Sequence, residues 1–192
     1  MGQAVKQTDG MTLDEFFAAF DSEPGKHVLV RGVPRLMSPA KPDHAIIQGN
    51  TLVIIAIHLR KLGGSRKAYP EAPISFRMFG HDNFRALDIL VDCSGMPTKG
   101  RAFEKPTVMV EVLSSSNEDE TWETIQACST IPSLKEILVL ASLKIEAQVF
   151  RRAADGTWED QPAEKKTSGA VTIEYLGLTL QLPEIYEGTT LV

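Results

Sequence analysis

The stretch from Arg85 to Gly95, RALDILVDCSG, decides the fold because it places two carboxylates around a run of core residues. The Ile-Leu-Val run at 89–91 is typical of a buried strand, yet Asp88 precedes it and Asp92 follows it. An aspartate in a buried strand is costly unless its charge meets a partner. Asp88 is therefore a candidate functional residue, and its role depends on which strand lies beside it.

A second stretch, PTVMVEVLSSS at 106–116, carries a single charged residue, Glu111, inside another apolar run. Side chains alternate along a strand, so Asp88 shares a face with Leu90, and Glu111 shares a face with Met109. If the two strands are neighbours, the two carboxylates converge near the strand ends. Converging carboxylates repel each other, and a hard divalent cation such as Mg²⁺ held between them relieves the repulsion.

A structural interpretation of the same two acids stays open. Isolated acids at strand ends often form an ion pair with an arginine or cap a nearby helix. Arg77 and Arg85 are close enough in the sequence to be such partners. The spacing of the residues does not decide between an ion pair and a metal site.

The chain has 192 residues, of which 43% are hydrophobic, so we expect one domain over residues 1–192. Periodicity predicts an α/β protein, an α+β mixed sheet in which two helices precede most of the strands. The first helix starts from a capping box of Thr12 and Glu15. The second, which we expect to be largely buried, runs from Asp43 as its N-cap to the double glycine at 63–64. A third helix is predicted within 114–129, and strands are predicted on either side of Gly32 and near 66–69, 73–78, 86–92, 107–113, 135–142, 144–153, 168–176 and 178–182.

Composition and charge narrow the class of protein. The net charge of −5 argues against strong nonspecific attraction to nucleic acid. Two basic segments, RKLGGSRK at 60–67 and TKGRAFEK at 98–105, are candidates for a local basic surface, although such clusters are usually solvated turns. The N-terminus lacks the apolar stretch of a secretory signal, and the longest apolar run is too short to span a bilayer. We therefore expect a cytoplasmic protein without membrane contact.

These stretches together resemble the Uma-two family of bacterial proteins, described as putative restriction endonucleases, and through it the PD-(D/E)XK nucleases. MTLDEFFAAF at 11–20 matches the opening helix of the family, and VRGVPRLMSPAKPDHAIIQGNTL at 30–52 matches its hairpin and His-led helix. RALDILVDCSG at 85–95 corresponds to the Arg-x-Pro-Asp strand of the family, and VEVLSSS at 110–116 corresponds to its Val-Glu-Val-Leu-Ser signature. TIPSLKEILVLAS at 130–142 and LTLQLPEIYEG at 178–188 match its downstream strand and C-terminal tail.

The resemblance implies a restriction-endonuclease-like core with flanking helices and an N-terminal helix–hairpin extension. In such nucleases the Asp and the Glu hold Mg²⁺ together with the backbone carbonyl that follows the Glu, and the metal activates water for phosphodiester hydrolysis. Carried over residue by residue, Asp88 and Glu111 are the metal ligands and Val112 offers the carbonyl, with Mg²⁺ or Mn²⁺ as cofactor. DNA is then the expected substrate. Nuclease folds often work as symmetric dimers, so a homodimer is one possible assembly, although the sequence itself does not identify the oligomeric state.

The chain departs from the family pattern at the residues that assist the metal pair. The family's lysine on the following helix falls on Thr124, and a glutamate of its first hairpin falls on Val28. Threonine carries no positive charge that could orient water or offset phosphate charge. Lys105 or Lys135 could supply that charge if either side chain reaches the site. His44 stands where the family also has a histidine, and it could reach the metal, a water molecule or a phosphate.

Two functions follow from this pattern. The first is a Mg²⁺-dependent DNA endonuclease, weakened by the missing lysine, whose catalytic set comprises Asp88, Glu111, Thr124 and His44. The second is a catalytically eroded protein of the same fold that serves as a nucleic-acid or protein binding module. The two acids favour the first function, whereas Thr124, Val28 and the acidic net charge favour the second.

Overall fold

The computed structural model describes residues 10–95, 97, 102–114 and 118–192. These residues form a mixed α/β structure with an eight-stranded mixed sheet, a two-stranded sheet and four α-helices. In chain order the elements are α1 (Leu13–Phe20), β1 (His27–Val30), β2 (Val33–Leu36), α2 (Pro42–Leu62), β3 (Lys67–Met78), β4 (His81–Asp92), β5 (Val108–Leu113), α3 (Glu118–Cys128), β6 (Glu136–Ala141), β7 (Ala147–Arg151), β8 (Glu164–Lys166), β9 (Ala170–Ile173), a 3-10 turn (Glu174–Leu176), β10 (Leu178–Gln181) and α4 (Leu182–Ile185).

The main sheet forks in its middle. Its strand order is β2-β1-β4-β5-β6-β7-β8, with β3 paired to β4, and β5 and β6 are parallel whereas the other paired neighbours are antiparallel. β3 pairs with β4 along nearly the whole strand. The opposite edge of β4 has two partners, because β1 meets it at Phe84 and β5 meets it from Ile89 to Val91. Residues 85–88 of β4 therefore border the fork between β1 and β5.

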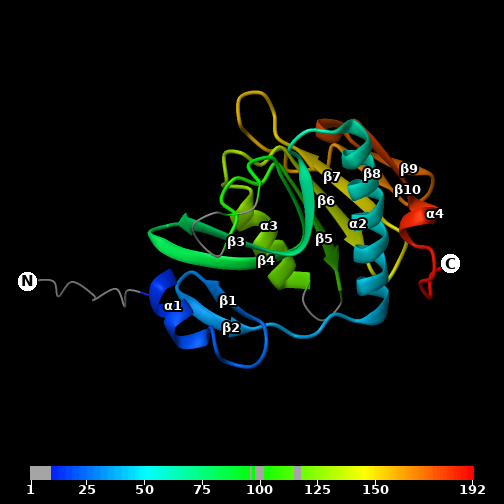
Figure 1. Cartoon of the computed structure of the whole chain (residues 1–192). Coiled ribbons are helices and arrows are strands. Elements are labelled where there is room, and N and C mark those ends of the chain that lie inside the picture. The colour runs from blue at the N-terminus through cyan, green and yellow to red at the C-terminus, as the bar shows by residue number, and fades with distance from the viewer. Residues whose placement is uncertain (1–9, 96, 98–101, 115–117) are drawn as a thin grey trace, which may run out of the picture.

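Apolar clusters cover both faces of the sheet. α2, the β9–β10 sheet and α4 cover one face, and α3 covers the other (Figure 1). On the first face Ile47 and Ile55 of α2 belong to the same cluster as Val110 of β5. On the second face Ile125 of α3 belongs to the same cluster as Met109, which lies two residues before Glu111 on β5. The central strands are thus held between two helices, which fixes the backbone that carries the acidic side chains.

The structure confirms the helix and the strand pair predicted near the N-terminus. In the capping box of α1, Thr12 Oγ1 accepts from the Glu15 N–H, and the Glu15 carboxylate accepts from the Thr12 N–H at 2.8 Å. β1 and β2 are joined by Arg31 and Gly32, both with positive φ, as two-residue hairpin turns with the strand twist require. β2 is the edge strand of the sheet, which is where a strand tolerates Pro34.

The long helix differs from its prediction at its start and in its burial. α2 begins at Pro42 after Lys41 as the N-cap residue, so the prediction of Asp43 as N-cap is wrong. Proline suits the first helical position because its missing N–H would have had no helical partner there. The prediction that the helix is largely buried is also wrong for one stripe, since Val53 and Ile57 are about half exposed.

α2 is long and apolar enough to cross a membrane, judged by length and composition alone. One helix of this kind is weak evidence for a membrane protein, because a core helix of a soluble protein passes the same test. Its buried residues Ile47, Ile55 and Leu59 pack in the apolar cluster of the sheet. The lack of membrane contact stays a prediction.

The remaining elements lie close to where the sequence places them. The segments predicted near 66–69 and 73–78 are one strand, β3, in which Glu71 has a positive φ and is left out of the pairing with β4. β6 and β7 form the predicted hairpin, and β9 and β10 pair only with each other. The Ser/Asn start predicted for the third helix, at 115–117, lies outside the described residues, and α3 is described from Glu118.

Candidate functional site

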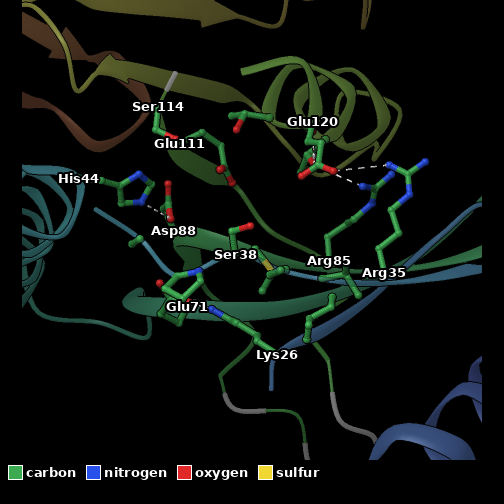
Figure 2. A pocket seen from close by; sticks show the side chains of 18 of the residues that line it. Lys26, Arg35, Ser38, His44, Glu71, Arg85, Asp88, Glu111, Ser114 and Glu120 are labelled. Atoms are coloured by element: carbon green, nitrogen blue, oxygen red, sulfur yellow. Dashed lines mark hydrogen bonds and ion pairs between the residues drawn. The ribbon is translucent and has the colours of Figure 1, made fainter. Parts of the chain in front are cut away.

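A cavity of about 290 Å³ occupies the fork of the sheet. Residues of β1, β4 and β5 line it together with the start of α2 and one side of α3 (Figure 2). Four of the predicted site residues line it, namely Asp88, Glu111, Thr124 and His44. The structure therefore brings together side chains that lie up to 80 positions apart in the sequence, the separation of His44 and Thr124.

Asp88 is fixed by three neighbours. Its Oδ1 accepts a hydrogen bond from His44 Nε2 at 3.0 Å, and its Oδ2 accepts from the Val112 N–H at 2.8 Å. Its backbone carbonyl accepts from the side chain of Gln48 on α2 at 2.8 Å, in place of a bond to a neighbouring strand. The carboxylate is thus oriented by a histidine and by the backbone of β5, and neither Arg77 nor Arg85 is among these partners.

Glu111 lies on β5, the strand next to β4, as the sequence predicts. The antiparallel register pairs Ile89 with Val110, and one further step of the same register would set Asp88 opposite Glu111. The ladder ends before that step. Like charges placed directly opposite each other destabilise a strand pair, so two acids at this position are unfavourable unless a cation joins them.

The Glu111 carboxylate is buried without a full set of partners. The residue is 6% exposed, and within the described part of the chain its Oε1 has no hydrogen-bond partner. Burial and the charge of Asp88 raise the pKa of Glu111 well above its ordinary value. A backbone hydrogen bond from Asp88 and the positive charges of Lys26 and Arg85 oppose this rise without cancelling it. A bound cation would supply the missing partner.

Val112, the predicted third ligand, follows Glu111 on β5 and is not among the lining residues of the cavity. In a strand the N–H and C=O of one residue point to the same neighbour and alternate in direction along the chain. Leu113 O accepts from Ser142 N at 2.9 Å on the β6 side, whereas Val112 N donates to Asp88 on the β4 side. The Val112 carbonyl therefore points toward β4 and Asp88, where the predicted third ligand is required.

Positive charge reaches the cavity from the α3 side through Arg85. This residue is buried, its Nη1 donates to Thr124 Oγ1 at 3.4 Å, and among the described residues its Nε and Nη2 have no partner. Burial lowers the pKa of Arg85, and the carboxylate of Glu123 opposes that shift. The helix position where the family carries a lysine thus lies beside a guanidinium.

The other predicted helpers are only partly brought together. Val28 lines the cavity, so the hairpin position of the family's glutamate faces the site but holds an apolar side chain. Lys105 and Lys135, which the structure describes, are not among the lining residues. Of the basic segment at 98–105, the stretch 98–101 lies outside the described residues.

Sequence reasoning missed two residues of the cavity wall, Lys26 and Glu71, and also Gln48 of α2, which contacts Glu71. Lys26 forms an ion pair with Glu71, and Gln48 Nε2 donates to Glu71 Oε1 at 3.0 Å. The sequence holds a signal that could have pointed to Glu71, because this residue lies between Pro70 and Pro73. Two prolines in four residues indicate an irregular edge strand. Nothing in the local sequence marks Lys26, which precedes β1 as an ordinary loop residue.

The residues present fit a hard divalent cation. Two carboxylates, one with an unpartnered buried oxygen, and a backbone carbonyl are ligands of the type that Mg²⁺ and Mn²⁺ accept, with water completing the shell. Among the side chains that the structure describes, no group of three or more His, Cys, Asp or Glu is arranged to hold a metal ion. The candidate site is therefore a two-carboxylate site.

Comparisons with known proteins identify the family and the fold of this chain. The family model Uma2, described as "Putative restriction endonuclease", matches residues 13–183. The uncharacterized protein slr1290 of Synechocystis sp. (strain ATCC 27184 / PCC 6803 / Kazusa) is 22% identical over 177 residues, which cover 91% of this chain and 90% of that protein. The crystal structure of a putative nuclease belonging to DUF820 from Anabaena variabilis ATCC 29413 superposes with a TM-score of 0.72 at 18% identity, covering 92% of this chain and 97% of that one.

Proposed function

This chain belongs to the Uma2 family of "putative restriction endonucleases", and on that premise we propose that it is a Mg²⁺- or Mn²⁺-dependent DNA endonuclease of the PD-(D/E)XK type. One observation carries the proposal: Glu111 is buried next to Asp88 in a cavity, and among the described residues one of its carboxylate oxygens has no hydrogen-bond partner. A buried acid without a partner is unfavourable for the fold and is typical of a functional site.

Each residue of the site has a role in this reaction. A bound metal ion would polarise the phosphate and lower the pKa of a water molecule. Asp88, Glu111 and the Val112 carbonyl would hold that ion, and His44 and the Val112 N–H keep the Asp88 carboxylate oriented toward the cavity. The Arg85 guanidinium, with two free nitrogens among the described residues, would offset negative charge on the phosphate oxygens.

The alternative function is a binding module of the same fold. Thr124 and Val28 line the cavity where a lysine and a glutamate are expected, and neither can carry charge. In this alternative the cavity accepts a nucleic acid or a protein without metal-dependent cleavage. The assay below separates the two functions, because only the enzyme requires both carboxylates.

The test is cleavage of supercoiled plasmid DNA with Mg²⁺ and, separately, with Mn²⁺. We expect slow nicking by the wild-type protein that disappears with EDTA and in the variants Asp88→Ala and Glu111→Gln. Asp160→Asn is the matched control, because this acid lies between β7 and β8 and is not among the lining residues of the cavity. Nicking that survives in both active-site variants, or its absence from the wild type, would favour the binding module.

A further inference from the structure

One lysine enters the cavity from the loop before β1. Lys26 lines the cavity with a side chain that is 43% exposed, and it is the one lysine among the lining residues that the structure describes. The negative charges of Asp88 and Glu111 raise the pKa of Lys26. Burial of the ammonium group lowers it by more, so that the pKa of Lys26 is lowered overall. Lys26 therefore brings a partly exposed positive charge to the cavity that holds the two acids.

The partner of Lys26 is held in an unusual backbone conformation. Glu71 has a φ of 48° in the middle of β3. The other non-glycine residues with positive φ in the described chain, Arg31 and Phe79, each precede a glycine in a two-residue hairpin turn, which requires that conformation. Glu71 lies in no turn, and a glycine there would avoid the strain. Strained residues of this kind concentrate at functional sites.

Glu71 is tied to the two acids through Gln48. The Gln48 amide donates to Glu71 Oε1 at 3.0 Å and to the Asp88 carbonyl at 2.8 Å. The other carboxylate oxygen of Glu71, Oε2, contacts Lys26 Nζ (Figure 2). The same buried amide thus fixes the position of Glu71, and through it of Lys26, relative to the backbone of Asp88.

We propose that Lys26 is a second phosphate-binding cation of this site, beside Arg85, and that Glu71 holds it in place until a phosphodiester oxygen of nucleic acid replaces the carboxylate. The proposal rests on the proposed nuclease function, whose cavity it shares. An ammonium group can exchange one anionic oxygen for another with little movement of its flexible stem. The chain thus supplies from the loop before β1 the positive charge that Thr124 does not supply from α3.

The test measures binding of a fluorescein-labelled DNA duplex by anisotropy in the presence of Ca²⁺, which takes the same oxygen ligands. Loss of one charged contact in Lys26→Gln should weaken binding roughly tenfold. It should also reduce the slope of log K against log salt concentration by about 0.9, the value for one phosphate contact. Glu71→Gln should strengthen binding several-fold, because Lys26 then has no competing carboxylate.

Two controls separate this role from general electrostatics and from a structural ion pair. Lys165→Gln removes a lysine that pairs with Glu146 away from the cavity, and it should leave the salt slope unchanged. In the double variant Lys26→Gln/Glu71→Gln the gain from Glu71→Gln should vanish, because its effect acts through Lys26. Thermal melting of each variant checks that the fold is kept.

Three results would overturn the proposal: no DNA binding by the wild type, an unchanged salt slope in Lys26→Gln, or a gain from Glu71→Gln that persists without Lys26. The plasmid assay decides the proposed function separately. Metal-dependent nicking with a Lys26→Gln salt slope like that of the wild type would retain the nuclease and remove this role of Lys26. Lys26-dependent binding without nicking would retain this role of Lys26 and remove the proposed nuclease function.

Discussion

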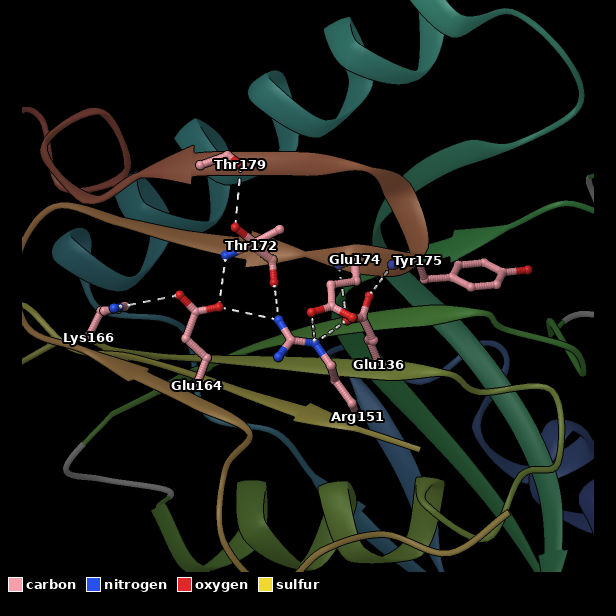
Figure 3. A network of polar contacts seen from close by, with 8 residues as sticks. All are labelled: Glu136, Arg151, Glu164, Lys166, Thr172, Glu174, Tyr175 and Thr179. Atoms are coloured by element: carbon pink, nitrogen blue, oxygen red, sulfur yellow. Dashed lines mark hydrogen bonds and ion pairs between the residues drawn. The ribbon is translucent and has the colours of Figure 1, made fainter. Parts of the chain in front are cut away.

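Two buried glutamates on neighbouring parallel strands have opposite surroundings. Glu136 on β6 is 3% exposed, and it accepts from Arg151 Nε at 2.9 Å and from the backbone N–H groups of Glu174 and Tyr175 at 3.0 and 2.7 Å (Figure 3). Glu111 on β5 is buried to a similar degree, but Asp88 lies beside it and, in the described chain, its Oε1 has no partner.

Within the described residues, the difference separates an acid that the protein satisfies from one that it leaves unsatisfied. Arg151 also donates to Glu164 and to the Thr172 carbonyl, so the Glu136 network joins β6, β7, β8 and β9 and is satisfied by the protein alone. A satisfied buried network holds elements together, whereas an unsatisfied buried acid lowers stability until a ligand completes it. The predictions that follow test this contrast between Glu136 and Glu111.

The largest effect is expected from breaking the satisfied network. Arg151→Met keeps the aliphatic stem but leaves Glu136 and Glu164 without their shared cation. Removing one partner of a buried pair is strongly destabilising, and we expect a loss of about 3 kcal/mol in the free energy of unfolding. Urea unfolding followed by circular dichroism measures it. A loss below about 1 kcal/mol would show that the network is not structural.

The same isosteric change at the two glutamates should have opposite signs. Glu136→Gln replaces one acceptor oxygen by an NH₂ group that faces a backbone N–H, so we expect a loss of about 2 kcal/mol. Glu111→Gln removes an acid whose ionisation beside Asp88 is unfavourable, so stability without divalent metal should be equal to the wild type or up to about 1 kcal/mol higher. Equal losses at both positions, measured by urea unfolding in EDTA, would contradict the contrast.

The last prediction concerns the pH dependence of stability. Because the pKa of Glu111 is raised in the folded protein, the native state binds a proton that the unfolded state has already lost in the window between the ordinary glutamate pKa and the raised value. Stability should therefore fall as pH rises through this window, by at most about 1.4 kcal/mol per pH unit.

Other ionisable groups line the same cavity as Glu111, namely Asp88, His44, Lys26 and Arg85. The effect of Glu111 is isolated by comparing urea unfolding of the wild type and Glu111→Gln in EDTA across the window. The wild type should show the steeper fall. Parallel pH profiles for the two proteins would mean that Glu111 does not titrate in the folded state within this range.

The sequence predicts the Asp88–Glu111 pair because both acids interrupt strands that are otherwise apolar, and strand periodicity is a local signal. It does not predict Lys26 or Glu71, because their meeting depends on a positive φ and on how the hairpin docks beside β4. The exposure of Val53 on an apolar helix is missed for the same reason, since hydrophobicity along α2 does not reveal which side the sheet covers.

The most direct test of the central claim, that Asp88 and Glu111 form a cation site, is calorimetric titration of Mn²⁺ into the wild type and Glu111→Gln near neutral pH. Repeating it in buffers of different ionisation enthalpy counts the protons released. We predict saturable binding to the wild type with proton release, because Glu111 must ionise to bind metal, and binding at least tenfold weaker without this release in Glu111→Gln. No saturable binding to the wild type, or equal affinity and proton release in both proteins, would contradict the claim.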